Sequence, residues 1–355
     1  LKNSRQNTPN QPSNYTKKHN GSGKRYILFG AIFLFMKHLL LTLMKPSILV
    51  GGQAVIEGVM MRVPGAYATA VRDPEGTVHV DKHDFTSRVE TSGFWKRPIL
   101  RGMMALFESM KMGMKTLQWS ADIAMPEEAE KQPGKLANFF TTLFAVLLAV
   151  GMFLVAPLGL TTWLMDIERE ALAFNLVSGL FRITFFILYL LAISLMKDVK
   201  RLFRYHGAEH RVVFNFESGK DVNVANAQSF STYHPRCGTS FLFIVLLSAI
   251  LVFALIDTIA MAIIGEITIF HRLAFHLPLM PLVAGVSYEI IKITARKDKS
   301  LFFRVLRAPG LWLQRITTQS PEDEMVDVAI TALENAFGEK YNEMVGKKYT
   351  AEAIG

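Results

Sequence analysis

The sequence predicts a mainly α-helical protein that crosses a membrane four times and carries a small α/β domain ahead of its first span. Three observations predict this fold class: half of the 355 residues are hydrophobic, they gather in long segments, and basic residues flank those segments. A spanning helix needs about 20 mostly apolar residues. Segments that reach or approach this length lie at residues 136–165, 181–196, 241–264 and 273–293.

The formal net charge of +9 bears on the partners of the protein. In a soluble protein such a charge would suggest a nucleic acid as partner. Basic residues beside apolar spans are better explained as topology signals, so we expect membrane lipids and no nucleic acid. The single cysteine, Cys237, excludes an intramolecular disulfide, which suits a reducing compartment.

The distribution of charge predicts the orientation of the spans. Lysine and arginine are frequent in the loop 197–239 and in the tail 294–355, whereas the connection between the first two spans holds Asp166, Glu168 and Glu170. The positive-inside rule therefore places the front domain, the loop and the tail in the cytoplasm. We expect a multi-pass protein of the bacterial inner membrane, with both termini cytoplasmic if the chain starts at Met44.

The first 43 residues differ from the rest of the chain. Residues 1–25 are polar and basic, and residues 26–44 are apolar but interrupted by Lys37. A further span at 26–44 would place the basic residues before it outside, against the positive-inside rule. We therefore interpret residues 1–43 as an upstream extension or leader of a protein that begins at Met44.

The cytoplasmic front domain is predicted at residues 44–135. Two β-like runs, 68–72 and 77–80, flank the turn-forming residues 73–76 (Asp-Pro-Glu-Gly), which predicts a hairpin. Residues 99–119 have apolar side chains at helical spacing, many of them methionine. Such a stripe is typical of a packed helix or of a helix that rests on lipid.

The remainder of the chain divides at its apolar segments. Residues 136–196 hold the first two spans, residues 240–293 hold the last two, and the loop 197–239 carries two polar motifs. In the C-terminal tail, apolar residues at helical spacing over 321–337 predict an amphipathic helix, which Ser320 would cap.

The first motif, Tyr205-His206-Gly207-Ala208-Glu209-His210, follows the second span. His206 and His210 are four residues apart and share one face of a helix, so their imidazoles can bind one divalent metal. His-x-x-Glu-His is the inverted zinc-peptidase pattern, in which the glutamate, here Glu209, acts as general base. The alternative is that these are interfacial polar residues that hydrogen-bond to backbone or lipid.

Further metal ligands are expected at the same cytoplasmic boundary. His234 and Cys237 directly precede the third span, Glu289 lies near the inner end of the fourth, and Glu57 belongs to a glycine-rich run. Zinc is the default metal for mixed nitrogen, oxygen and sulfur ligands. The predicted ligand candidates are His206, His210, His234, Cys237, Glu289 and Glu57. Glu289 could instead pair with a lysine such as Lys292, and Cys237 could be a small buried residue.

Three ordered blocks of residues resemble a known family. They are Gly-Gly-Gln-Ala-Val-Ile-Glu-Gly-Val-Met-Met-Arg at 51–62, Tyr-His-Gly-Ala-Glu-His at 205–210 and His-Pro-Arg-Cys-Gly-Thr-Ser-Phe at 234–241. With Pro-Gly-Leu-Trp-Leu-Gln at 309–314 and Thr-Thr at 317–318, they resemble the YqhQ-like family of bacterial membrane proteins. The resemblance runs from about residue 44 to 337. It implies a membrane protein of unknown function that is catalogued as a predicted metal-dependent enzyme.

Three classes of function remain open on the sequence. The leading hypothesis is a metal-dependent hydrolase at the cytoplasmic face of the membrane, with Glu209 as its catalytic residue. The second is a non-enzymatic scaffold or assembly factor that contacts other membrane proteins and uses the metal structurally. The third, a transporter, is less favoured, because Asp257 is one acid within the spans and defines no clear substrate path.

Overall fold

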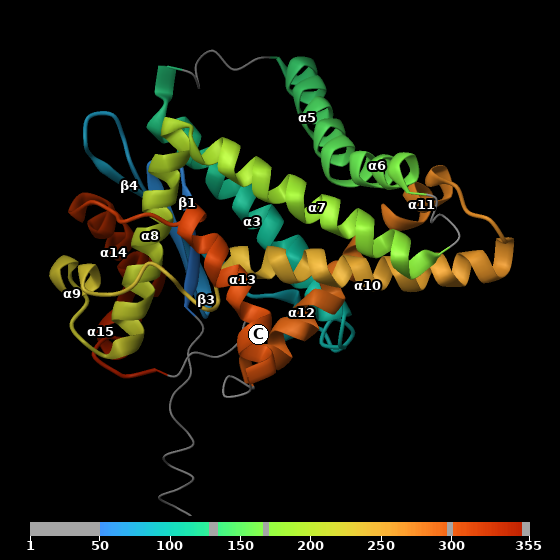
Figure 1. Ribbon diagram of the computed structural model, residues 1–355. Coiled ribbons are helices and arrows are strands. Elements are labelled where there is room, and N and C mark those ends of the chain that lie inside the picture. Colours follow the sequence, from blue (N-terminus) through green and yellow to red (C-terminus); the bar gives the residue numbers. More distant parts are fainter. Residues whose placement is uncertain (1–49, 128–133, 166–169, 297–300, 350–355) are drawn as a thin grey trace, which may run out of the picture. The chain divides into compact units, whose positions relative to one another are not determined.

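The computed structural model describes residues 50–127, 134–165, 170–296 and 301–349. They all belong to one compact unit, Ser47–Gly355. The extension predicted at residues 1–43 lies outside the described residues. The described chain is mainly helical and contains a four-stranded antiparallel sheet near its start (Figure 1).

The sheet is built from successive hairpins in the order β1-β2-β3-β4. Its strands are β1 (Gly51–Val55), β2 (Gly58–Val63), β3 (Gly65–Arg72) and β4 (Val78–Phe85). The predicted hairpin at residues 73–76 is confirmed: Arg72 pairs with Val78 across it. The turn is closed by the Thr77 amide, which donates to the side chain of Asp73 at 2.7 Å.

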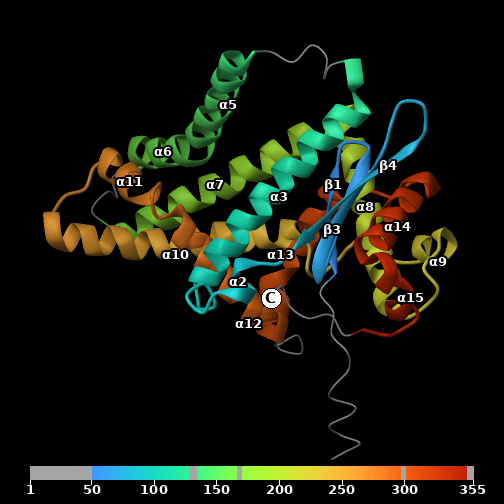
Figure 2. The ribbon, with the colours of Figure 1, turned by 180° about the vertical axis from the view of Figure 1, so that it is seen from behind.

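Both faces of the sheet are covered by helices. Side chains alternate along a strand, so Val59 and Met60 point to opposite faces. The Val59 face packs against α8 (Lys197–Ser218) and α14 (Asp323–Phe337), and the Met60 face packs against α3 (Leu100–Ala124). Figures 1 and 2 show the sheet between these helices from its two sides.

The tail helix α14 completes the core of the sheet. It lies within the range predicted for an amphipathic helix, although Glu322, not Ser320, occupies the position before its first turn. Its apolar side, which includes Val326, Ala329 and Leu333, is fully buried against the strands and α8. The front of the chain and its end therefore share one hydrophobic core.

Three helices in the described chain are long and apolar enough to cross a membrane, or four if one bent pair is counted as a span. The apolar part comprises α5 (Lys135–Val150), the π-helix η1 (Gly151–Val155), α6 (Ala156–Leu164), α7 (Ala171–Ser194), α10 (Gly238–Ile264), α11 (Ile269–His276) and α12 (Met280–Arg296). The first candidate span, Leu136–Leu164, combines α5, η1 and α6.

Two of the predicted spans differ from the structure. The second begins at Ala171 instead of residue 181, because polar residues such as Asn175 and Ser178 interrupt the apolar run before residue 181 although they are buried. The fourth is two helices, α11 and α12, bent by 60° at a break that contains Pro278. Proline lacks the amide proton that a continuous helix needs.

The remaining helices connect the sheet to the apolar bundle. Helix α10 packs against α7, α12 and α13 (Leu301–Thr317), and α3 packs against α12. The short elements are α2 (Arg88–Thr91), α9 (Val224–Gln228), the 3-10 helix η2 (Gly338–Lys340) and α15 (Tyr341–Met344). Helix α8 follows α7 and lies on the sheet, so its polar motif sits between the sheet and the bundle.

Candidate metal centre

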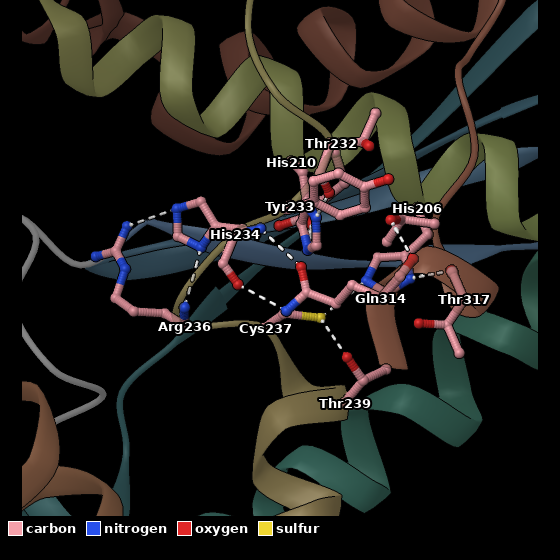
Figure 3. Close-up of polar contacts among 12 residues, drawn as sticks. His206, His210, Thr232, Tyr233, His234, Arg236, Cys237, Thr239, Gln314 and Thr317 are labelled. Atoms are coloured by element: carbon pink, nitrogen blue, oxygen red, sulfur yellow. Dashed lines mark hydrogen bonds and ion pairs between the residues drawn. The ribbon is translucent and has the colours of Figure 1, made fainter. Parts of the chain in front are cut away.

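Three of the predicted ligands come together in the structure. One ligand atom from each of His206, His210 and Cys237 lies within 4.8 Å of the other two. The two histidines are one turn apart on α8, and their ring centroids are 4.5 Å apart. Cys237 is the residue that precedes α10, and its Sγ lies 3.2 Å from Nε2 of His206 (Figure 3).

Backbone carbonyls orient both imidazoles. Nδ1 of His206 donates to the carbonyl oxygen of Thr317 at 2.8 Å, and Nδ1 of His210 donates to that of Thr232. A carbonyl only accepts hydrogen bonds, so the proton of each neutral ring is fixed on Nδ1 and Nε2 keeps its lone pair. Hydrogen bonds of this kind orient metal-binding histidines in proteins.

Glu209 lies beside the three ligand atoms and is buried. Its Oε2 is 3.4 Å from Nε2 of His210, and the Gly52 amide donates to its carboxylate from β1. Gly52 permits this approach, because a Cβ there would lie 3.1 Å from Cγ of Glu209. Burial raises the pKa of Glu209, although His206 and His234, when protonated, would act in the opposite direction. Burial lowers the pKa of His210, which favours the neutral ring.

The loop that carries Cys237 is held by α13. The side-chain amide of Gln314 accepts from the His234 amide at 2.7 Å and donates to the His234 carbonyl at 2.8 Å. The Cys237 amide then donates to that same carbonyl at 3.2 Å, and its Sγ lies 3.2 Å from Oγ1 of Thr239 (Figure 3). The position of the thiol is therefore set by a helix distant in sequence.

His234 lies next to the three ligands but has other partners. Its ring centroid is 5.5 Å from that of His210. Its Nδ1 accepts from the Arg236 amide at 3.3 Å, and its Nε2 lies 3.9 Å from Oε2 of Glu217. Burial alone would raise the pKa of Glu217, but hydrogen bonds and charges from His234 and Arg236 hold it below its ordinary value. The structure thus places His234 in an ion cluster beside the candidate centre.

The structure does not bring Glu289 or Glu57 into the group of His206, His210 and Cys237. Both carboxylates bind a guanidinium side-on. Oε1 of Glu289 accepts from Nε of Arg101 at 2.7 Å, and its Oε2 accepts from Nη2 of the same residue. Glu57 binds Arg201 in the same way, with Nη2 donating to Oε2 at 2.6 Å.

Sequence reasoning missed the groups that orient the ligands. The carbonyls of Thr232 and Thr317 belong to the backbone, which leaves no signal in residue type. Gln314 and Thr317 lie in the last blocks that resemble the YqhQ-like family, and that resemblance was the available signal. No spacing rule connects residues 314–317 to a motif about 110 positions earlier.

In the described residues, fold and site define a class of protein: mainly helical, with three or four long apolar helices and a largely buried histidine–cysteine group beside a small antiparallel sheet. The chain belongs to the family described as "Protein of unknown function (DUF1385)", whose model matches residues 97–339. It is 30% identical over 307 residues to "Uncharacterized protein YqhQ" of Bacillus subtilis (strain 168), covering 83% of this chain and 92% of that protein.

These matches confirm the resemblance to the YqhQ-like family. No solved structure matches the chain. The descriptions of the family and of the Bacillus protein name no metal, reaction or partner, so the metal dependence stays a prediction.

Proposed function

We propose that this chain is an integral protein of the bacterial inner membrane that binds one zinc ion and acts as a metal-dependent hydrolase at the cytoplasmic face. One observation carries the proposal: His206, His210 and Cys237 offer three ligand atoms within 4.8 Å, and both histidines are already oriented by carbonyls. Three protein ligands with a fourth position open is the ligand count of catalytic zinc sites.

The distances fit a zinc ion. Zinc–nitrogen bonds of about 2.0–2.1 Å and zinc–sulfur bonds of about 2.3 Å place tetrahedral ligand atoms roughly 3.3–3.6 Å apart. Nε2 of His206 and Sγ of Cys237 are 3.2 Å apart. These two atoms would therefore need to move only slightly to bind one ion, and the ligand atom of His210 lies within 4.8 Å of both.

Each residue of the site has a role in this proposal. The metal supplies Lewis-acid chemistry to a hydrolysis. Glu209 lies next to the ligand atoms and is placed to accept a proton from a water molecule at its carboxylate. Cys237 directly precedes the apolar helix α10, so the site lies at the end of a candidate span. We expect the substrate to present its reactive group at that boundary.

Exposed apolar surface supports the insertion in a membrane. On the first candidate span, Leu136 is 70% exposed and Phe144 is 68% exposed. Soluble monomers rarely leave contiguous surface of this kind open to water. Lipid tails would cover it, which makes membrane lipids the immediate surroundings of these helices.

Metal content tests the proposal directly. The full chain would be purified in detergent and its zinc measured by mass spectrometry. We expect about one zinc per chain in the wild type and less than a tenth of that in His206→Ala/His210→Ala, because two of three ligands are lost. His79→Ala/His83→Ala on β4 is the matched control and should keep its zinc. Equal zinc in the wild type and the His206/His210 variant would end the proposal.

The alternative is a non-enzymatic scaffold or assembly factor with a structural metal, whose partners are other membrane proteins. The depth of the site favours it: His210 is 2% exposed, Glu209 5% and Cys237 7%. Cobalt substitution distinguishes the two. If a coordination position is open, azide should change the absorption spectrum of the cobalt-substituted protein, both in the wild type and in Glu209→Gln. If the site is closed, azide should leave the spectrum unchanged. A closed site in which Glu209 is the fourth ligand also predicts that Glu209→Gln binds the metal more weakly than the wild type.

A further inference from the structure

A second polar cluster is buried among α7, α10 and α11, apart from the candidate metal centre. Asp257 of α10 is its central residue. It accepts hydrogen bonds from Asn175 at 2.7 Å, from His276 at 2.9 Å and from Arg272. Asp257 and His276 are 0% exposed, and Asn175 and Arg272 are 1% exposed. Both carboxylate oxygens of Asp257 are thus used within the cluster.

A second arginine, Arg182 of α7, faces the same cluster. Its guanidinium lies over the ring of Phe253 at 5.1 Å, and Phe253 stacks on His276 at 3.9 Å. The side chain is buried, with 4% exposed. Among the described residues, Nε and Nη2 of Arg182 have no hydrogen-bond partner.

The charge of Arg182 has no carboxylate partner among the described residues. Arginine stays protonated in proteins, and the carboxylate of Asp257 already accepts from Arg272, His276 and Asn175. A buried cation without a partner is strongly unfavourable, and the face of Phe253 compensates for it only in part. One negative charge would balance that of Arg182.

The two unpartnered atoms of Arg182 define the shape of the group that fits. Nε and Nη2 (the second terminal nitrogen) lie on one edge of the guanidinium, and this edge binds the two oxygens of a planar oxyanion side-on. The protein uses the same edge elsewhere. Arg101 binds Glu289 through Nε and Nη2, and Arg201 binds Glu57 through the same two atoms.

We propose that Arg182 binds the carboxylate of a small monoanion inside the bundle of α7, α10 and α11. A monoanion would neutralise the single positive charge of the Arg182 guanidinium. The helix break directly after His276 supports a ligand site here. Interrupted helices in membrane proteins occur where the backbone is buried in protein or lines a cavity, and transporters build binding sites from them.

The depth of Arg182 argues against a phospholipid phosphate as the anion. Arg182 lies ~16 Å along α7 from Ala171 at about 1.5 Å per residue, and half of a bilayer hydrocarbon core is about 15 Å thick. If α7 spans a membrane, the guanidinium is near the midplane and far from the head groups. Two sources of a carboxylate remain, a water-soluble acid or a fatty acid.

Binding measurements on the full chain in neutral detergent test this proposal. The probes are acetate and benzoate for a water-soluble acid, laurate for a lipid-derived one, and chloride as a spherical monoanion, all at constant ionic strength. We expect acetate or benzoate to raise the unfolding temperature with saturation. Affinity should fall about tenfold or more in Arg182→Gln, which loses the charge-assisted pair. It should fall less in Arg182→Lys, which keeps the charge, and not in Arg204→Gln, whose guanidinium pairs on the surface with Glu322.

A saturable response to laurate alone would also support the carboxylate site and would assign it to a lipid-derived acid. Absence of a response to all three carboxylates in the wild type would overturn the proposal, and so would chloride binding as tightly as acetate. If Arg182→Gln does not fold, the response of the wild type and the carboxylate affinity of Arg182→Lys test the proposal. The experiment is independent of zinc, because His206→Ala/His210→Ala should bind the carboxylate as the wild type does.

Discussion

Gly207 separates the two candidate ligand histidines, and the structure explains why a glycine stands there. A Cβ at this position would lie 1.9 Å from the carbonyl oxygen of Gln319. The Gln319 amide donates to the carbonyl of Phe203 on α8 at 3.0 Å. Two backbones therefore run in direct contact here, and the same contact brings the carbonyl of Thr317 to His206.

We predict that Gly207→Ala lowers both stability and zinc content. The added methyl group forces α8 away from residues 317–319, which should cost about 1–3 kcal/mol of unfolding free energy and remove the acceptor of His206. Thermal unfolding and zinc analysis would measure the two effects. Gly238→Ala, where nothing lies within 4 Å of the new Cβ, is the matched control. Normal zinc in Gly207→Ala would show that this backbone contact does not position His206.

At the scale of elements, Glu289 connects the start of α3 to α12. Ile99, the residue before α3, has φ 68° and ψ −53°, and the Leu100 amide donates to the carbonyl of Pro98 at 2.8 Å. This is a γ-turn, a strained conformation for a residue with a side chain. Glu289 accepts from the Ile99 amide at 3.2 Å and binds Arg101. The carboxylate therefore holds the turn in place.

We predict that Glu289→Ala destabilises the protein by about 1–3 kcal/mol, because it removes charge-assisted hydrogen bonds and leaves Arg101 without its carboxylate. Denaturant unfolding would measure this change. Glu324→Ala removes a similar contact, to Arg72, but the Glu324 side chain is 74% exposed, so its effect should stay below about 0.5 kcal/mol.

The zinc content of Glu289→Ala gives a second result. We expect it to equal that of the wild type, since the carboxylate is engaged by Arg101. Loss of zinc in a folded Glu289→Ala variant would restore Glu289 as a metal ligand, as the sequence suggested.

The sequence predicted elements well where local chemistry decides them. The Asp-Pro-Glu-Gly turn, the length of the apolar helix α10 and the amphipathic helix α14 could be predicted without knowledge of tertiary contacts. The start of α7 and the break between α11 and α12 could not. Asn175 and Ser178 look like the end of a span in a hydropathy profile, but both are buried, and Asn175 donates to Asp257 on a neighbouring helix.

At the scale of the whole molecule, the candidate site was predictable only in part. Helical periodicity places His206 and His210 on one face, and topology places Cys237 and Glu289 at the same boundary. Topology does not specify which side chains meet. An arginine reaches Glu289, and Gln314 fixes the loop so that Cys237 approaches His206. These side-chain pairings depend on packing between segments that are far apart in sequence.

Membrane insertion with the proposed orientation predicts a pattern of chemical labelling. Glu170 and Glu343 are exposed residues on opposite sides of the proposed membrane. In intact cells, a membrane-impermeant maleimide should label Glu170→Cys. It should label Glu343→Cys only after the membrane is permeabilised, because the tail would be cytoplasmic. The wild-type protein is the control, because its single cysteine, Cys237, is buried and should not be labelled. The reverse pattern would invert the topology, and labelling of both in intact cells would contradict it.

The pairing of α14 with the sheet has a consequence for synthesis. Among the described residues the strands β1 to β4 leave the ribosome first, yet one of their apolar faces gains its cover only when α8 and finally α14 have been made. Thr317, which orients His206, lies just before α14. If the apolar helices insert into a membrane during translation, they do so while this face of the sheet is still uncovered. The sheet, although it is made early, completes its hydrophobic core only after the last long helix has been made.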